Sequence, residues 1–169
     1  MRRLALVLAP VAAVLALSAC ATAEKLGAAD DIHALLISIR DDDKIAFDAH
    51  VDHDALKAEL RTRLGDSLGA SKNTRDLVDL LGSSVIDMAD QALVRPATFR
   101  LVAEHYGYRA DKPIPGPIAI SQALKTLPDG RVCATKTKNG PCLLDFTRER
   151  GVWKLSGFEG DPSMLRLKL

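Results

Sequence analysis

The segment at residues 41–54, DDDKIAFDAHVDHD, holds six aspartates and two histidines in fourteen positions. In a helical turn His50 stands three residues before His53 and four before Asp54, so their donor atoms would converge. Together with Asp52, these imidazole and carboxylate groups would suit zinc or a similar ion. Aspartates also gather at helix starts, because a carboxylate there faces the positive end of the helix dipole. The segment is therefore either a metal site or the polar junction between two helices.

The sequence carries no other recognisable catalytic signature. It contains neither a G-x-S-x-G motif nor a phosphate-binding glycine loop, and it predicts no cofactor. His33 and His105 lie in predicted helical segments that offer them no nucleophile to serve. If the fold encloses a cavity, we expect the aromatic side chains of Phe99, Tyr106 and Trp153 to line it. The simpler role of an aromatic residue such as Trp153 is to fill the core.

The first twenty residues, MRRLALVLAPVAAVLALSAC, have the order of a bacterial export signal. Two arginines precede an apolar run, residues 4–17, that is short for a permanent membrane helix. The run ends in Leu17-Ser18-Ala19-Cys20, which resembles the lipobox of bacterial lipoproteins, where the chain is cleaved and the cysteine is lipidated. An ordinary secretory leader needs no cysteine there. The sequence thus predicts a signal peptide at residues 1–19 and a palmitate-containing lipid anchor at Cys20.

The residues after Cys20 predict the location of the protein and the limits of its domain. Ala21 is not aspartate, which by the sorting habit of Gram-negative lipoproteins implies the outer membrane and a domain facing the periplasm. Residues 20–29 are small and polar, as a lipidated tether would be, and residues 30–169 have the length of a single domain. The mature chain is nearly neutral without a basic cluster, which argues against a nucleic-acid partner. The predicted partners are the membrane and an envelope protein.

Cys133 and Cys142 remain as an even pair in an oxidising compartment, where disulfides persist. They lie in a hairpin-like segment, RVCATKTKNGPCLLDF. A two-residue Asn139-Gly140 turn fails because Pro141 has no N–H to close it, and because that register keeps the cysteines apart. A longer loop centred between residues 137 and 138 would place them opposite each other. We predict a disulfide across this hairpin; the alternative is two reduced cysteines.

Hydrophobic periodicity divides the rest of the chain into helices followed by strands. Apolar spacings of three and four predict helices over residues 30–40, 54–64, 74–94, 96–107 and 118–127. Alternation and turn residues predict strands over residues 132–136, 142–147, 152–158 and 165–169. Asp129-Gly130 and residues 148–151 are the expected turns, with Gly151 free to take a positive φ. This order predicts an α+β domain, with N-terminal helices packed on one face of a C-terminal three- to four-stranded antiparallel sheet.

Two segments together resemble a known bacterial family. ALLISIRDDDKIAFDAHVDHDALKAEL combines an apolar helix, an aspartate-bearing break and a V-D-x-x-x-L-K element, and LLDFTRERGVWKLSGF combines a strand, a charged turn and W-K-L. Over most of residues 30–160 this pattern resembles the family catalogued as domain of unknown function 2939, which has no assigned activity. The arrangement is also distantly similar to the cone-shaped folds related to nuclear transport factor 2, in which a curved sheet wraps a helix.

The resemblance bears on the aspartate and histidine segment. Residues 45–51 alternate as in a strand, but the resemblance favours a helix over residues 44–50. It then implies that Asp43 and Asp52 cap consecutive short helices, each accepting from free N–H groups of the first turn. The family usually has an aromatic or apolar residue at the position of His53.

These observations predict a non-enzymatic, periplasm-facing envelope lipoprotein that binds a partner protein or an envelope component. Two alternatives remain open. One is a binder of a small apolar ligand in a pocket between the helices and the sheet. The other is a metal-dependent or hydrolytic enzyme that uses residues 48–54.

Overall fold

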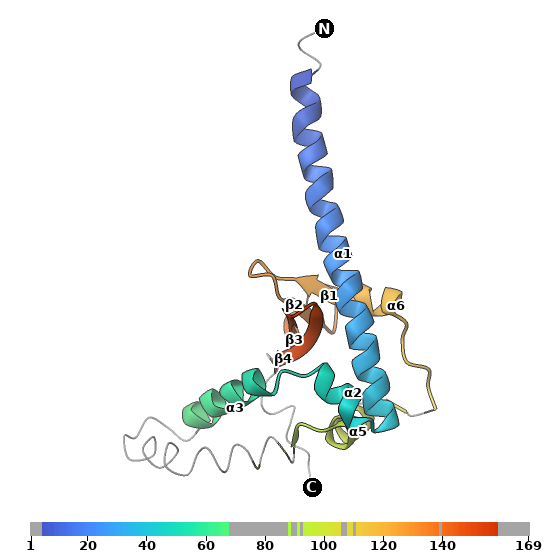
Figure 1. Ribbon diagram of the computed structural model, residues 1–169, viewed down its shortest axis with the longest axis vertical. Helices are drawn as coiled ribbons and strands as arrows, with labels where there is room; N and C mark the ends of the chain where they lie inside the picture. Colours follow the sequence, from blue (N-terminus) through green and yellow to red (C-terminus); the bar gives the residue numbers. More distant parts are fainter. Residues whose placement is uncertain are drawn as a thin grey trace.

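The computed structural model describes residues 5–67, 88, 91, 93–105, 108–109, 111–138 and 140–158 (Figure 1). The helices are α1 (Ala5–Asp41), α2 (Lys44–Ala49), α3 (His53–Ser67), α5 (Pro96–His105) and α6 (Pro117–Gln122). The strands are β1 (Leu124–Thr126), β2 (Val132–Thr135), β3 (Cys142–Glu149) and β4 (Val152–Phe158). Most of the predicted helix at 74–94, and all of the predicted strand at 165–169, lie outside the described residues. In the described part of the chain, no helix is long and apolar enough to cross a membrane.

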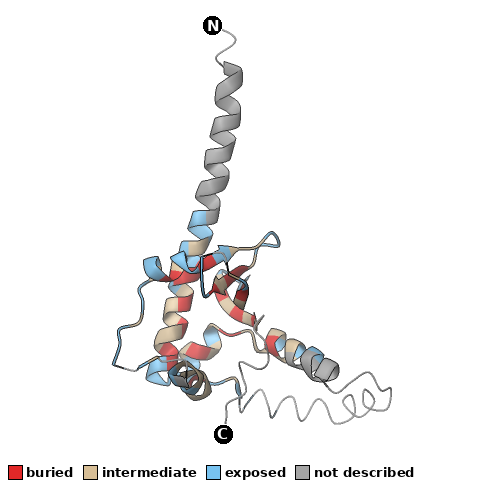
Figure 2. Cartoon of the chain, turned by 180° about the vertical axis from the view of Figure 1, so that it is seen from behind, coloured by how far each residue is buried: buried red, intermediate tan, exposed pale blue. Residues whose placement is uncertain are grey.

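The four strands form one antiparallel sheet in the order β1-β2-β3-β4, and the helices contact it, which confirms the predicted α+β class. Buried residues lie on the facing parts of α1 and the sheet (Figure 2). Val132, Phe146 and Leu155 lie side by side on neighbouring strands and are all buried. Trp153 is buried on the same face of β4, two residues before Leu155. Trp153 therefore has the core role that its type predicts.

Helix α1 buries its predicted apolar face, as the burial of Ile32 and Leu35 shows. The buried face begins earlier than predicted, because Ala28 and Ala29 are also fully buried. The segment assigned to a tether, residues 20–29, is helical throughout. Its alanine, glutamate, lysine and leucine residues are strong helix formers, which the tether interpretation overlooked. From residue 22 onward, where burial is described, the first buried residue is Ala28, two residues before the predicted start of the domain at residue 30.

The predicted helix at 118–127 is half right. Helix α6 begins at Pro117, a residue suited to a first helical position, and ends at Gln122. The next residues form β1, in which Leu124 is buried and Lys125 is exposed. Leu124 pairs with Ala134 of β2, so a partner ten residues away decides the conformation. The fourth strand of the sheet is therefore β1, at the edge next to β2.

Two tight turns form where the sequence predicts them. Between β1 and β2, Gly130 takes a φ of 84°. Between β3 and β4, Arg150 and Gly151 take φ values of 50° and 93°. Positive φ at both central residues is the mark of the type I′ turn, whose twist suits a two-residue hairpin.

The predicted disulfide is present, with the Cα atoms of Cys133 and Cys142 5.5 Å apart. The predicted register is wrong. Cys133 lies opposite Asp145 and Cys142 lies opposite Thr135, with a shift in register between these two pairs. Such a bulge leaves one residue unpaired and displaces the following side chains along the strand. The cysteines therefore meet across the bulge and not as directly opposed residues.

Candidate functional site

The three consecutive aspartates after α1 have separate structural roles. Asp41 pairs with the preceding arginine, whose Nε lies 2.7 Å from Asp41 Oδ1. Asp42 has a φ of 57° and ends α1, and the N–H of Asp43 donates to the carbonyl of Ser38 (2.9 Å) in a C-terminal cap. Asp43 Oδ1 accepts from the N–H of Ala46 (3.0 Å) and so caps α2. None of these roles needs a metal ion.

The end of the segment begins α3. Asp52 Oδ1 accepts from the N–H of Ala55 (3.0 Å), so the predicted caps at Asp43 and Asp52 are both confirmed. Asp54 is exposed in the first turn of α3, where a carboxylate favours the helix dipole.

Between α2 and α3, a single residue adds a parallel bridge to the free edge of β4. Val51 pairs with Leu155. The N–H of Leu155 donates to the carbonyl of His50, and the N–H of Asp52 donates to the carbonyl of Leu155, both at 2.9 Å. The helix predicted over residues 44–50 is confirmed as α2, with His50 as its C-cap. Of the residues that alternate as in a strand, Val51 pairs with the sheet. This bridge fastens the segment to the sheet.

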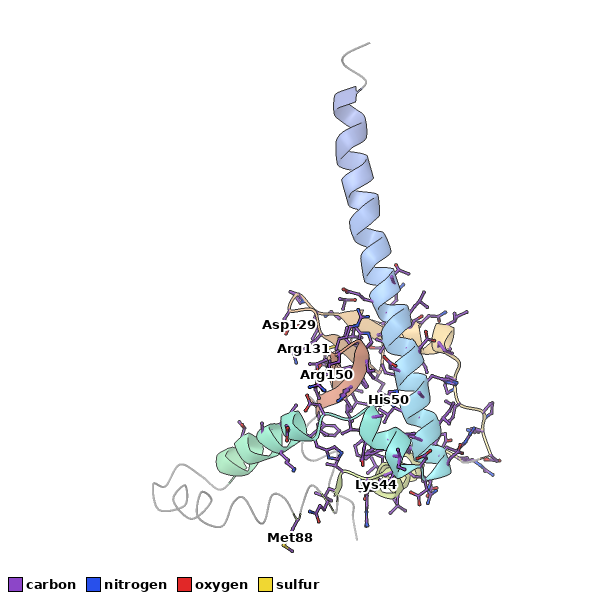
Figure 3. The ribbon with its side chains drawn as sticks, viewed as in Figure 1. Lys44, His50, Met88, Asp129, Arg131 and Arg150 are labelled. Atoms are coloured by element: carbon purple, nitrogen blue, oxygen red, sulfur yellow. A yellow bond between two sulfur atoms is a disulfide. The ribbon has the colours of Figure 1, made fainter. Side chains whose placement is uncertain are left out.

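His50 occupies the junction of α1, α2 and β4 (Figure 3). Its Nδ1 lies 2.9 Å from the carbonyl oxygen of Ala46, which only accepts, so Nδ1 carries the hydrogen. Its Nε2 faces Asp31 Oδ1 of α1 at 3.7 Å, an ion-pair distance when the imidazole is protonated. Asp31 Oδ2 in turn accepts from the backbone N–H of Trp153 at 2.8 Å. Asp31 therefore ties α1 to both His50 and β4.

His53 belongs to a second, more exposed group. Its Nε2 lies 3.1 Å from Asp48 Oδ1, and Lys44 Nζ lies 2.5 Å from Asp48 Oδ2. Partial burial acts to raise the pKa of Asp48, but the hydrogen bonds from Lys44 and His53 outweigh it and lower the pKa below its ordinary value. Asp48 is therefore a stable anion that fixes the ring of His53.

The structure does not bring the four metal candidates together. His50 faces Asp31, His53 faces Asp48, and Asp52 caps α3. In the described part of the chain, the one group of three possible donors comprises Cys133, Cys142 and Asp145, with ligand atoms within 4.8 Å of one another. Because its two sulfurs are bonded to each other, that group offers an ion a single carboxylate. The convergence predicted for residues 50–54 is wrong, because helix capping and carboxylate pairing direct these side chains apart.

Sequence reasoning missed the residues that protect the edge of β4. Along this edge the N–H groups of Trp153, Leu155 and Phe158 find acceptors on three different elements. The carboxylate of Asp31 on α1 accepts from the first of these N–H groups, and the backbone carbonyl of His50 accepts from the second. Glu59 Oε2 of α3 accepts from the third at 2.9 Å. An unprotected edge strand invites pairing with other chains, and these acceptors prevent it. No local pattern marks Asp31 or Glu59, because the groups that they meet lie about a hundred residues away.

A second missed residue is Asp145, a buried carboxylate on β3. Its Oδ2 lies 2.8 Å from Nη1 of Arg131, and Arg131 Nε lies 2.8 Å from Asp129 Oδ2. The arginine therefore links the buried carboxylate to the β1–β2 turn, which lies at the surface. A buried charge with such a partner holds a hairpin in place and is no sign of catalysis by itself.

The predicted pocket residues that the structure describes pack into the core. Phe99 of α5 meets Phe47 edge-on, with ring centroids 5.3 Å apart, and lies 6.2 Å from Phe158. Trp153 packs against α1, where a Cβ added to Gly27 would lie 3.7 Å from its Nε1. Tyr106 lies outside the described residues, as does the side chain of His105. The apolar-ligand pocket stays a prediction.

Comparison with known proteins finds no match: no protein-family model matches the sequence, and neither a curated protein nor a solved structure is similar to it. The resemblances to domain of unknown function 2939 and to the cone-shaped folds therefore stay predictions based on motifs and on the order of elements. Function has to be argued from the geometry of the chain itself.

Proposed function

We propose that this chain is a lipid-anchored module of the bacterial envelope that binds a partner protein at the end of the domain farthest from its anchor. The observation that carries the proposal is a set of exposed apolar side chains at that end. We call this set the distal apolar group; its members are Ile45, Met88, Leu93 and Leu101.

The position of this group follows from α1. Asp41 lies about 32 Å along the helix from Cys20, at 1.5 Å per residue. Helix α2 follows directly and carries Ile45, and the contact between Phe47 and Phe99 holds α5 beside it. Figure 3 places Lys44, at the start of α2, and Met88 toward this end of the molecule. The group thus faces away from a membrane that holds Cys20.

Two residues of the group are exposed although they lie close in sequence to residues of the core. Ile45 is 86 % exposed and Leu101 is 60 % exposed, although each lies two residues from a phenylalanine of the core cluster. A helix turns about 200° over two residues, so Ile45 and Leu101 lie on the outer sides of their helices. Exposed charged residues of both signs precede Ile45 in the sequence: Arg40, the aspartates of residues 41–43, and Lys44. A partner surface that is apolar with polar and charged groups at its rim would fit this end.

Two further observations support the proposal. The Cys133–Cys142 disulfide suits an oxidising compartment such as the periplasm. The histidines and aspartates of residues 41–54 serve caps and pairs within the fold, which leaves the enzyme alternative without a described site.

Site-specific photo-crosslinking in a Gram-negative host tests the proposal. A photoreactive residue at position 45 or 101 should give one discrete heavier product that contains a second protein. The same residue at Thr137, exposed on the β2–β3 loop, is the control and should give none. With the probe at position 45, Leu101→Asp should abolish the product, whereas Thr137→Asp on the exposed β2–β3 loop should leave it unchanged. Equal products at 45 and 137, or none at 45 and 101, would contradict the proposal.

A further inference from the structure

Helix α1 connects the predicted anchor to the domain without a flexible linker. It runs without a break from before Cys20 to Asp41. From residue 22 onward, where burial is described, the first fully buried side chains are Ala28 and Ala29, eight and nine residues after Cys20. Eight helical residues span about 12 Å, whereas the same residues fully extended would span about 27 Å. A helical connection therefore holds the packed domain close to whatever binds Cys20.

This length matches the thickness of a lipid headgroup layer. The polar layers add about 10–15 Å to the hydrocarbon core of a bilayer, so each is about 5–8 Å thick. With the acyl chains of Cys20 in the hydrocarbon, Leu26 lies about 9 Å farther along α1, at the outer edge of the headgroups. The packed domain begins immediately beyond this level.

The end of the domain that faces the anchor carries apolar side chains of its own. Leu26 on α1 is 41 % exposed and Ile118 on α6 is 73 % exposed. Helix α6 packs beside the middle of α1, at the opposite end of the domain from α2 and α5, as Figures 1 and 2 both show. Ile120 of the same short helix is buried, so α6 turns one isoleucine to the core and the other outward.

The charged residues of α1 beside Leu26 cancel each other. Glu24 and Lys25 are neighbours just before Leu26 and offset each other. A contact here with a phospholipid layer would therefore rest on apolar side chains entering the headgroup boundary, without a need for anionic lipid.

Resting on the lipid anchor of the proposed function, we infer that the α1–α6 end of the domain is seated directly on the bilayer, with Leu26 and Ile118 at the outer edge of the headgroups. The module is then not a tethered domain that tumbles freely. The seat fixes its orientation and turns the distal apolar group toward the periplasm.

Fluorescence quenching on vesicles tests the seat. The lipidated chain is bound to phosphatidylcholine vesicles that contain a lipid with a nitroxide on its headgroup. A dye is attached to Ile118→Cys or, as the matched control, to Ile45→Cys, under conditions that keep the native disulfide. We expect quenching at position 118 to exceed that at position 45 several-fold. Equal quenching at both positions would overturn the inference.

A second variant tests whether α1 acts as a rigid spacer, without a further change at position 118. An insertion of about 16 glycine and serine residues after Ala21 adds a flexible span of about 22 Å. Quenching at position 118 should then fall toward the level at position 45. Unchanged quenching would overturn the role of α1 as a rigid spacer. Chain that fails to sediment with the vesicles would overturn the anchor and the seat together, whereas sedimentation without quenching at position 118 would overturn the seat alone.

Discussion

Replacement of Cys133 and Cys142 by alanine should lower the free energy of unfolding by about 2.5 kcal/mol. The disulfide closes a loop between cysteines nine residues apart, and the loss of loop entropy in the unfolded chain predicts this amount. Alanine avoids a polar group at the fully buried position 133. Urea denaturation of the oxidised protein and of the double variant measures the difference.

A reductant provides the matched control for this prediction. The wild-type protein should fall to about the stability of the double variant in reductant, and the variant should not respond. Equal denaturation midpoints for the oxidised protein and the variant would contradict the prediction. The β2–β3 hairpin would then be held by its ladder and by the Arg131–Asp145 pair alone.

Replacement of Asp31 by alanine should lower the free energy of unfolding by about 2 kcal/mol, the range for a charge-assisted hydrogen bond. The change removes the acceptor of the Trp153 N–H and the carboxylate that faces His50. The N–H is then left on the edge of β4 without its partner, which costs more than the loss of an exposed pair. Urea denaturation again gives the measurement.

Asp30 offers the control on the same turn of α1. It is exposed, and its replacement by alanine should change stability by no more than about 0.5 kcal/mol. Asp31→Asn keeps an oxygen acceptor and should recover part of the loss. Equal losses for the alanine variants at positions 30 and 31 would show that Asp31 does not fasten α1 to the sheet.

Features with a local cause could be predicted from the sequence. These features are the apolar face of α1, the caps at Asp43 and Asp52, and the turn at residues 148–151 with a positive φ at Gly151. Each depends on residues that lie close together in the sequence. The disulfide was also predictable, because the two cysteines lie in one hairpin.

Features with a distant cause could not be predicted. Leu124 becomes a strand because it pairs with β2, and Val51 bridges to Leu155 of β4. Asp31 acquires its role from Trp153, 122 residues away. Distant contacts also explain why the predicted convergence of metal ligands at residues 50–54 was wrong. Spacing along the chain placed those donors together, but contacts with α1 and β4 and the caps of α2 and α3 direct them apart.

The length of the connection to the predicted anchor depends on tertiary packing. Residues 20–29 have a composition compatible with a linker or with a helix, and the burial of Ala28 and Ala29 against the core favours the helix. This difference turns a free tether into a spacer of defined length, and both proposals rest on it.

The mass of the mature protein, extracted from the envelope of a Gram-negative host, tests the central claim most directly. The account predicts a chain that begins at Cys20, with a diacylglyceryl group on its sulfur and an acyl group on its amino terminus. Cleavage at another residue, or a mature chain with an unmodified Cys20, would contradict the anchor, the seat on the bilayer and the outward direction of the distal apolar group.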